Sequence, residues 1–378
     1  MTAYEELCAI TDVCDKFASR EIGPAALEAD LESRTAWVPE VWAKTREVGI
    51  PGLPVPEEYG GAGQPGDGCA SVIDVISFYC PGIASVLCNH FAAVACMHHS
   101  GASQKAAYYQ RLANPEAGEP VIGTVAFPPD TCDLSLTGHG DSVFLDGTVP
   151  LLGSALHARY CCLFINEEVN GRAVTGLVVD MKAPGVAVGE NPKLPGLKVN
   201  PFAPVRFERV NIGQDSLLGE KGNAGAILEH GKRAWFGYLA AAAIGAARSA
   251  SNKARAYASQ RYQFGKIIIH HQEIQRMLGA MLMKIDVGTS AYLCALSDEK
   301  GGPPWSVPSP LFAKIYCTDM AMEVVLDAIQ IHGGYGYMHE YGVEKLMRDC
   351  KVLQLMGGSN PSLLAGHTAA NVTDIPLK

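Results

Sequence analysis

Gln330-Ile-His-Gly-Gly-Tyr-Gly-Tyr337 opens the stretch that decides the fold, which continues with Glu344-Lys-Leu-Met-Arg-Asp349 and ends with Gly357-Gly-Ser-Asn360. The stretch predicts one helix that ends at a glycine corner, a second helix of mixed charge, and a second glycine corner. Glycine lets the backbone adopt positive φ and approach a ligand closely.

A second motif is Arg261-Tyr-Gln-Phe-Gly-Lys266, with Gln272 six residues after its end. A guanidinium group binds phosphate oxygens in a forked geometry, so Arg261 is a candidate phosphate ligand. Gly265 follows a helical run and is expected to cap the C-terminus of that helix. Taken alone, the motif is better explained by a surface arginine and a helix end.

Composition narrows the classes of function. The chain has 378 residues, of which 48% are hydrophobic and 18% are charged, as in globular proteins of two or three domains. Its net charge of −9 argues against a nucleic-acid-binding surface. No apolar run is long enough to predict a membrane span, and the first residues do not resemble a secretory signal. We therefore expect a cytoplasmic protein.

The twelve cysteines and eleven histidines could suggest a metal site or disulfides. Neither a CxxC pair nor an HExxH-type spacing occurs, so the sequence predicts no metal site. Without a secretory signal, the cysteines are expected to be reduced and buried as small apolar residues.

Local patterns divide the chain into three zones, which we interpret as domains. Residues 1–117 have helical periodicity, residues 118–219 have short β-type runs between turn residues, and residues 220–378 are helical again. The predicted fold class is α+β and multi-domain. It consists of an N-terminal helical domain, a central β-barrel-like domain (a small barrel or a sandwich), and a C-terminal four-helix bundle.

Turn and breaker residues predict details within these zones. Pro81-Gly82 should divide the apolar stretch 69–99 into a pair of helices. Asp146-Gly147 and Asn170-Gly171 should form hairpin turns between strands. A further helix is expected over 311–331, after a proline-rich loop.

The two motifs together resemble the acyl-CoA dehydrogenase family, in particular its divergent, acyl carrier protein-linked members in polyketide pathways. Val55-Pro-Glu-Glu-Tyr-Gly-Gly-Ala-Gly63 resembles the family's N-terminal domain, and Leu217-Leu-Gly-Glu220 resembles its junction after the β-domain. The resemblance covers nearly the whole chain in the expected order. It implies an FAD cofactor between the β-domain and the C-terminal bundle, with part of the site supplied by a second subunit. A homodimer or homotetramer is therefore expected.

The resemblance also implies which residues hold FAD. Those expected near its pyrophosphate and adenine are Arg261, Gln263, Phe264, Gln272, Gln330, Gly333 and Gly334. Three others are expected near the flavin ring, where Ser359 replaces the family's threonine: Val125, Ala126 and Ser359.

The catalytic base of the family is missing. Gly357 stands where the commonest branch has its glutamate, and the position used by a second branch falls near Trp235, with no acid beside it. The catalytic residue is therefore unknown, and the weak candidates are Glu229 and Glu340. Glu340 is better explained as a capping residue near the start of a helix expected over 340–355.

Two further departures concern the flavin and the substrate. The family's flavin-contacting loop becomes Ala126-Phe-Pro-Pro-Asp-Thr-Cys-Asp133, and its Trp-Ile-Thr segment becomes Leu151-Leu152-Gly153. We expect FAD to bind in a shifted position or more weakly. Trp235 and Phe236 are either core residues or the lining of a substrate pocket, and as a lining they would admit only a short acyl group.

Three functions remain open. The first is an FAD-dependent dehydrogenase for a short acyl thioester on CoA or acyl carrier protein, with a non-standard base or regiochemistry, in specialised or polyketide extender-unit biosynthesis. An electron-transfer flavoprotein is the usual acceptor in the family and a candidate partner here. The alternative is a flavin-dependent monooxygenase or oxidase on the same fold. The third is a non-catalytic binding protein, against which the intact cofactor motifs argue.

Overall fold

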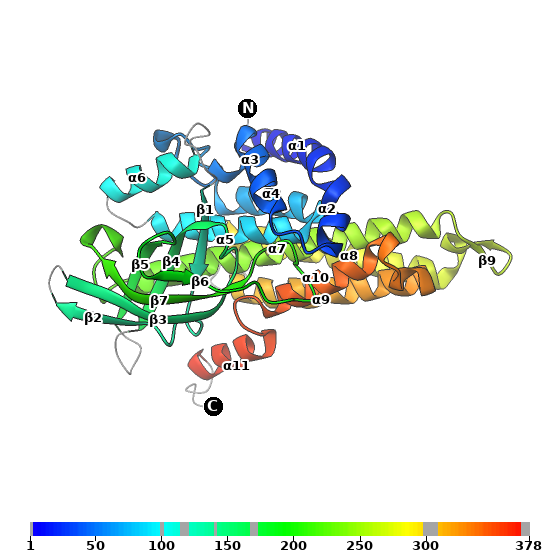
Figure 1. Ribbon diagram of the computed structural model, residues 1–378. Coiled ribbons are helices and arrows are strands. Elements are labelled where there is room, and N and C mark those ends of the chain that lie inside the picture. The colour runs from blue at the N-terminus through cyan, green and yellow to red at the C-terminus, as the bar shows by residue number, and fades with distance from the viewer. Residues whose placement is uncertain are drawn as a thin grey trace, which may run out of the picture.

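The structure, a computed structural model, describes residues 3–98, 102–113, 121–139, 142–166, 173–297 and 309–371. Two helical regions enclose a central β region along the chain, as Figure 1 shows. One large core cluster contains buried residues from both helical regions, and a smaller cluster lies within the β region. The boundary expected at residue 117 lies outside the described residues, so the domain limits stay predictions.

The N-terminal region is built of helices that pack on the C-terminal bundle. Pro81 starts the second member of a helix pair, as the sequence predicted, because proline fits the first turn of a helix. This pair contacts the long helix α7, and Ser77 donates a hydrogen bond to the carbonyl of Ala242. The elements are α1 (Ala3–Glu21), α2 (Gly23–Leu31), α3 (Trp37–Glu47), η1 (Ile50–Gly52), η2 (Glu57–Tyr59), α4 (Gly66–Tyr79), α5 (Pro81–Met97) and α6 (Ala102–Ala113).

The β region consists of two four-stranded sheets, and among the described residues they do not close into a barrel. One sheet has the order β1-β4-β5-β8 and the other β2-β3-β7-β6. The barrel-like expectation is thus corrected to two sheets. Their strands are β1 (Ile122–Ala126), β2 (Ser135–His139), β3 (Ser142–Leu152), β4 (Ala158–Asn166), β5 (Val174–Asp180), β6 (Val186–Val188), β7 (Ala203–Ile212) and β8 (Leu217–Leu218), with η3 (Gln214–Ser216) before the last.

The hairpin expected at Asp146-Gly147 is wrong. Both residues lie inside β3, where the register with β7 shifts between Leu145 and Gly147. Gly147 has φ +124, and a Cβ there would lie 2.2 Å from the carbonyl oxygen of Asp133. The dipeptide therefore forms a bulge in a continuous strand. The turn expected at Asn170-Gly171 lies outside the described residues.

The C-terminal region is a bundle of long helices around α7. The alanine-rich middle of α7 lets neighbouring helices approach closely, and residues 239–247 are all buried. Figure 1 shows α7, α8, α9 and α10 along an arm that projects from the β region. The helices are α7 (Gly225–Ala258), η4 (Ile268–His270), α8 (Gln272–Leu296), α9 (Pro310–His332), η5 (Gly333–Tyr337), η6 (His339–Tyr341), α10 (Val343–Leu355) and α11 (Asn360–Asn371). No helix in the described ranges is long and apolar enough to cross a membrane.

Gly265 is not a helix cap. Helix α7 ends at Ala258, and Gly265 lies in a two-residue turn that joins β9 (Tyr262–Gln263) to β10 (Lys266–Ile267). Phe264 and Gly265 have φ of +53 and +80, the backbone signs that a tight hairpin requires. The hairpin forms the tip of the arm in Figure 1.

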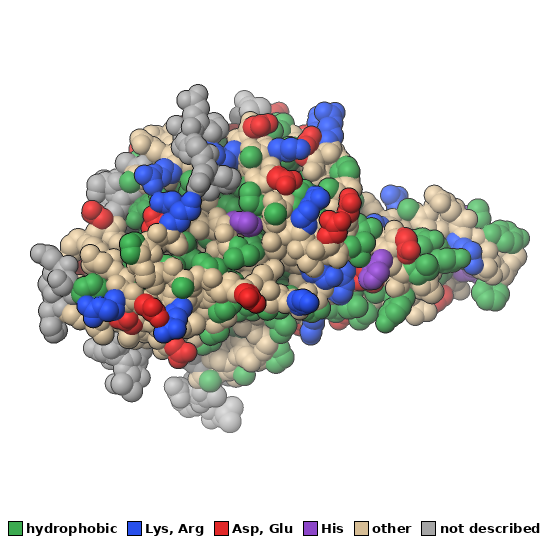
Figure 2. Space-filling view, viewed as in Figure 1, with side chains coloured by type: hydrophobic (Ala, Val, Ile, Leu, Met, Phe, Trp, Pro, Cys, Tyr) green, Lys and Arg blue, Asp and Glu red, His purple; other side chains and the backbone are tan. Residues whose placement is uncertain are grey.

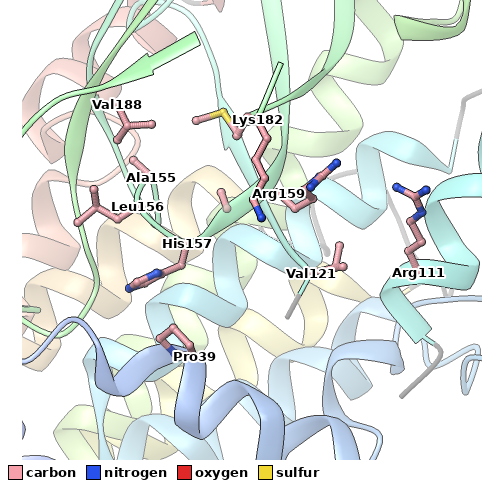
Figure 3. A pocket seen from close by; sticks show the side chains of 11 residues that line it. Pro39, Arg111, Val121, Ala155, Leu156, His157, Arg159, Lys182 and Val188 are labelled. Atoms are coloured by element: carbon pink, nitrogen blue, oxygen red, sulfur yellow. The ribbon is translucent and has the colours of Figure 1, made fainter. Parts of the chain in front are cut away.

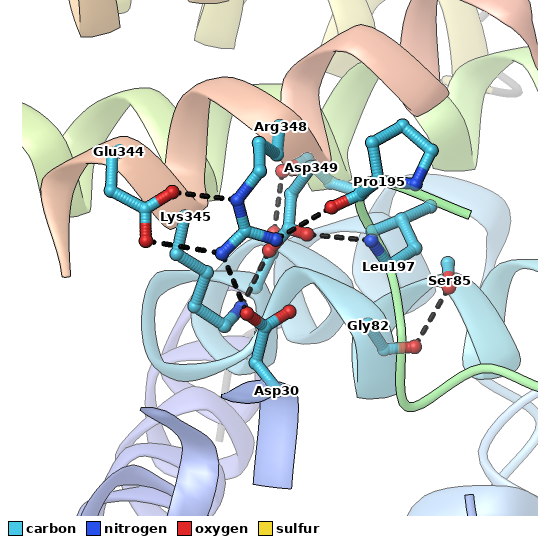
Figure 4. A network of polar contacts seen from close by, with 11 residues as sticks. Asp30, Gly82, Ser85, Pro195, Leu197, Glu344, Lys345, Arg348 and Asp349 are labelled. Carbon is cyan, nitrogen blue, oxygen red and sulfur yellow. Dashed lines mark hydrogen bonds and ion pairs between the residues drawn. The ribbon is translucent and has the colours of Figure 1, made fainter. Parts of the chain in front are cut away.

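An ion-pair network at the start of α10 joins the three regions of the chain (Figure 4). The Arg348 guanidinium donates to Asp30 of α2 at 2.7 Å, to Glu344 at 2.6 Å, and to the carbonyl of Pro195 at 2.6 Å. Asp349 accepts from the backbone of Leu197 and pairs with the buried Lys345. The charged half of the signature therefore fixes α10 against the helices and the β region.

Candidate active site

Two cavities meet where the β region, α7 and α10 come together. The first, which we call the β-side cavity, has a volume of about 280 Å³. It lies between β1, the end of β3 and the C-terminal half of α10. Its lining includes Asn89, Val125, Ala126, Leu151, Leu152, Gly153, Leu194, Pro195, Phe202, Lys351, Val352, Leu355 and Met356.

The second, the α11-side cavity, has a volume of about 500 Å³ and lies between α7, α11 and the loop after β1. Its lining includes Phe127, Pro128, Pro129, Glu229, Lys232, Phe236, Leu311, Ser362, Leu363, Gly366 and His367. Four residues line both cavities and form the shared wall: Asp130, Trp235, Gly357 and Gly358. The two spaces are thus neighbours, separated in part by two residues without side chains.

The glycine corner at Gly357 and Gly358 leaves no room for the glutamate of the family. Gly357 has φ +76, and a Cβ there would lie 2.8 Å from Cε1 of Phe236 and 3.1 Å from Cζ3 of Trp235. The two aromatic rings of α7 occupy the space where a side chain would begin. The lack of a side chain at Gly357 is therefore matched by the close packing of two rings against it.

Lys314 of α9 stabilises the same glycine corner by hydrogen bonds. Its buried Nζ donates to the carbonyls of Gln354 at 2.9 Å and Gly358 at 3.1 Å, and to Oδ1 of Asn360 at 2.6 Å. Burial lowers the pKa of Lys314 to about 7, although three acceptors favour the charged ammonium. The corner is thus fixed by one titratable side chain.

Trp235 and Phe236 are both buried and both line a cavity. The indole Nε1 of Trp235 donates to Oδ1 of Asn89 at 3.0 Å, which fixes the ring across the shared wall. The rings of Trp235 and Phe236 stack with centroids 6.3 Å apart. The sequence leaves Trp235 and Phe236 either as core residues or as the lining of a pocket. The structure combines both, because their rings are buried in the core and their outer surface lines the α11-side cavity.

Sequence reasoning missed Asp130. The residue follows Pro128-Pro129 in the loop after β1, and its backbone N–H donates to the carbonyl of Phe127 at 2.9 Å. Its side chain reaches cavity solvent and has no hydrogen bond or ion pair within the described residues, yet the surrounding walls raise the pKa of its carboxyl. The signal available in the sequence was an acid after Pro128-Pro129, in the loop that departs from the family's flavin-contacting loop.

The two expected carboxylate candidates lie in different places. Glu229 lines the α11-side cavity, where it faces Lys232 on the same helix. Burial lowers the pKa of Lys232, while Glu229 acts in the opposite direction. Glu340 lies in η6, ahead of α10, whose 13 residues span about 20 Å at 1.5 Å per residue, whereas Gly357 follows the far end of that helix. Glu340 is therefore too far from the shared wall to act there.

A third cavity, of about 540 Å³, lies at the tip of the arm and collects most of the residues expected at the FAD pyrophosphate. It is lined by Arg261, Gln263, Phe264, Gln330, Gly333 and Gly334. The guanidinium of Arg261 also lies 5.6 Å from the ring centroid of Tyr335. The two motifs of the sequence therefore meet at one site, although they are separated by more than sixty residues along the chain.

The remaining site residues are divided between the cavities and the helix starts. Val125 and Ala126 line the β-side cavity, and their expected place near a flavin ring stays a prediction. Gln272 is the exposed first residue of α8 and does not line the tip cavity. Ser359 precedes α11, and its Oγ accepts a hydrogen bond from the backbone N–H of Ser362 at 3.4 Å. This contact makes Ser359 the N-terminal capping residue of α11.

A basic cavity of about 660 Å³ lies apart from these three, between α3, α6 and the start of β4 (Figure 3). Arg159 pairs with Asp180 at 2.7 Å and Arg111 donates to Oη of Tyr160 at 2.6 Å. Nε2 of His157 lies 3.0 Å from the carbonyl of Thr35. The basic side chains are thus largely engaged by the protein, and none of the signature residues lines this cavity.

Comparison with known proteins identifies the relatives of the chain. Residues 4–116 match the N-terminal domain of acyl-CoA dehydrogenases, and residues 237–366 match their C-terminal domain. An acryloyl-CoA reductase (NADH) of Anaerotignum propionicum is 30% identical over 91% of this chain and 89% of its own length. The chain belongs to the acyl-CoA dehydrogenase family. It is an FAD-dependent oxidoreductase of that family.

Solved structures of the family confirm the fold. Butyryl-CoA dehydrogenase from Megasphaera elsdenii superposes with a TM-score of 0.88, at 24% identity over 98% of both chains. The prolyl acyl carrier protein oxidase AnaB superposes with a TM-score of 0.86, at 20% identity over 98% of this chain and 99% of its own. The order of helical, β and helical regions is therefore that of acyl-CoA dehydrogenases.

The residues of this chain fit FAD, the cofactor of the family. The tip cavity supplies a guanidinium and two amide side chains beside Gly333 and Gly334, a donor set suited to a pyrophosphate. A Cβ at Gly334 would meet nothing within 4 Å, so its backbone is open to a ligand. The β-side cavity has mainly apolar walls of the kind that a planar ring system requires. Leu151, Leu152 and Gly153, which stand in place of the family's Trp-Ile-Thr segment, are part of these walls.

Proposed function

We propose that the protein is an FAD-dependent dehydrogenase of a short acyl thioester carried on CoA or acyl carrier protein. The observation that carries this proposal is the shared wall between the β-side and α11-side cavities. A flavin ring in the first and an acyl group in the second would meet at the shared wall, where Gly357 and Gly358 carry no side chains. Such contact is what hydride transfer requires, because reacting atoms must lie about 3–3.5 Å apart.

The chemistry is divided between cofactor and chain. FAD supplies the two-electron acceptor. The chain orients the acyl group with Trp235 and Phe236, and the apolar residues of both cavities exclude water from the reacting carbons. Because these two rings close the α11-side cavity against α7, the acyl group that fits is short.

The chain also supplies evidence for a second subunit in the FAD site. From Trp235 at the shared wall to Ala258 at the end of α7, the helix rises about 35 Å at 1.5 Å per residue. One FAD molecule cannot reach from the β-side cavity to the tip cavity over that distance. This distance supports an arrangement in which the tip of one subunit completes the FAD site of another, in at least a homodimer.

The surface of the arm agrees with this arrangement. Phe264 is 91% exposed and Tyr337 is 83% exposed, and Figure 2 shows hydrophobic side chains gathered towards the tip of the arm. Further along the arm, Leu282, Met283 and Val287 of α8 are exposed as well. Apolar surface of this extent on one element marks an interface, and a homotetramer would cover α8 in addition to the tip.

The finer assignments rest on the departures from the family. Loss of the usual glutamate and of the flavin-side tryptophan supports a specialised reaction, and the extender-unit pathways of polyketide assembly are the setting that we propose. The likeness to an acyl carrier protein oxidase supports a protein-bound substrate. An electron-transfer flavoprotein is the proposed acceptor.

The test is anaerobic reduction of the bound flavin. Purified protein should be yellow, and short acyl thioesters should bleach its flavin absorbance under anaerobic conditions, whereas long-chain thioesters should not. Phe236→Ala should move the preferred chain length upwards, and Phe207→Ala, in the separate β core, should not. A yellow protein that no CoA or carrier-protein thioester bleaches would exclude the proposal. Rapid reoxidation by oxygen with a hydroxylated product would identify the monooxygenase or oxidase instead.

A further inference from the structure

We propose that Asp130 is the catalytic base, placed on the loop after β1 rather than on the bundle that supplies the base elsewhere in the family. This inference rests on the proposed function. It follows from position: Asp130 is the one carboxylate-bearing residue among those that line both the β-side and the α11-side cavities. A base for dehydrogenation must reach the substrate carbon beside the one that faces the flavin. A residue of the shared wall borders both the space proposed for the flavin and the space proposed for the substrate.

The loop around Asp130 is held firmly in place. The Oγ1 of Thr131 donates to the carbonyl of Phe164 in β4, and the backbone N–H of Cys132 donates to the carbonyl of Pro129. The ring of Phe127 stacks on Phe164 at 5.5 Å between centroids. The loop is therefore attached on both sides of Asp130, while the carboxylate itself has no partner within the described residues. A fixed backbone with an unengaged carboxylate is the arrangement that a general base needs.

Other titratable groups around the two cavities are less suited to the role. Glu229 and Lys232 of α7 and His367 of α11 line only the α11-side cavity, and Lys351 of α10 lines only the β-side cavity. Glu229 also has an opposite charge in Lys232 close by. The Asp130 side chain is exposed to cavity solvent, and its partial burial raises the pKa of its carboxyl, a direction that favours proton acceptance.

The carboxylate of Asp130 accepts the proton from the carbon next to the thioester carbonyl, and the electron pair of that C–H bond forms the new carbon–carbon double bond. The C–H bond of the adjacent carbon breaks at the same time, and its hydride, with two electrons, passes to oxidised FAD. The products are the enoyl thioester, reduced FAD and protonated Asp130, whose proton later returns to solvent.

The experiment compares Asp130→Asn, Asp130→Glu and Asp133→Asn in the FAD-loaded full-length protein. Asp133 lies in the same loop and lines neither cavity, so its variant is the matched control. The probe is a short acyl-CoA, with two readouts: anaerobic flavin bleaching, and exchange of the hydrogen next to the carbonyl in deuterated water. Exchange reports proton removal alone. Asp130→Asn should lose both by about 10²–10⁴-fold, Asp130→Glu should recover part, and Asp133→Asn should match the wild type.

The outcomes separate the two proposals. If the wild type neither bleaches nor exchanges with any thioester, the proposed function fails. If the wild type reacts and Asp130→Asn reacts equally well, only this inference fails. The same holds if Glu229→Gln abolishes exchange while Asp130→Asn retains it. An unchanged flavin spectrum and thioester-induced spectral shift in Asp130→Asn establish that the variant is folded and binds substrate.

The pH profile gives an independent readout. The bleaching rate of the wild type should rise as pH increases through the pKa of Asp130, because only the carboxylate accepts a proton. In Asp130→Asn this rise should disappear from whatever rate remains. A profile that keeps the same rise in the variant would assign it to another group and overturn the inference.

Discussion

The two ends of helix α10 differ in their side chains. At its start, Arg348 and Lys345 are paired with carboxylates and carbonyls from all three regions of the chain. At its end, Gly357 and Gly358 carry no side chains and open onto two cavities. One sequence signature therefore contains two parts with different roles. The ion pairs around Arg348, which we call the scaffold end, fix α10 in place, and the glycines after α10, which we call the open end, border the cavities of the candidate active site.

The largest effect is expected from breaking the scaffold end. Arg348→Met leaves the buried carboxylates of Asp30 and Glu344 without their main partner, and loss of one member of a buried pair costs about 3–5 kcal/mol. The free energy of unfolding, measured by urea denaturation, should fall by that amount.

Arg206→Met is the matched control, because Arg206 and Glu208 form an exposed pair in β7. Exposed pairs contribute about 0–1 kcal/mol. Equal losses in the two variants would show that the network around Arg348 does not hold the regions together.

A smaller effect on the free energy of unfolding is expected from adding a side chain at the open end. Gly357→Ala places a methyl group at φ +76, 2.8 Å from the ring of Phe236, and such strain costs about 1–3 kcal/mol. The variant should also retain less FAD, measured as the ratio of flavin to protein absorbance. Gly213→Ala is the control, because Gly213 has φ −80 and open space at its Cβ position. If Gly357→Ala retained as much FAD as the control, the glycine corner would not contribute to FAD binding.

The smallest effect concerns pH and Lys314 beneath the corner. Its folded-state pKa, about 7, lies below that of the unfolded chain, so between pH 7 and the unfolded value of 10.5 the unfolded state binds more protons. The free energy of unfolding should therefore increase with pH across this window. The increase should be weaker in Lys314→Met, as measured by thermal unfolding at pH 7, 8 and 9. An identical pH dependence in both proteins would mean that the three acceptors keep the ammonium charged throughout.

Sequence reasoning succeeded where the deciding signals are local. The helix pair broken at Pro81 and the helix after the proline-rich loop follow from residues that act within one turn of the chain. It failed at Asp146-Gly147 because a bulge and a hairpin turn use the same residues, and only the partner strand β7 distinguishes them. It failed at Gly265 because a helix cap and a hairpin turn both require positive φ.

The candidate site shows the same limit more clearly. Six of the residues expected at the FAD pyrophosphate line the tip cavity together, since they belong to two continuous motifs. Their role in FAD binding stays a prediction. Asp130 was missed because its position depends on the meeting of a β-region loop, α7 and the end of α10, three segments distant in sequence. The missing glutamate at Gly357 was visible, but not that two aromatic rings fill its place.

The exposed hairpin at the tip of the arm has a consequence for how the protein is handled. Because Phe264 and Arg261 would serve the FAD of another subunit, assembly and cofactor loading become linked equilibria. Dilution would release FAD along with the partner subunit, and added FAD would draw subunits together. Activity per mole of protein would then fall with dilution, and the flavin would behave as a ligand that joins two chains.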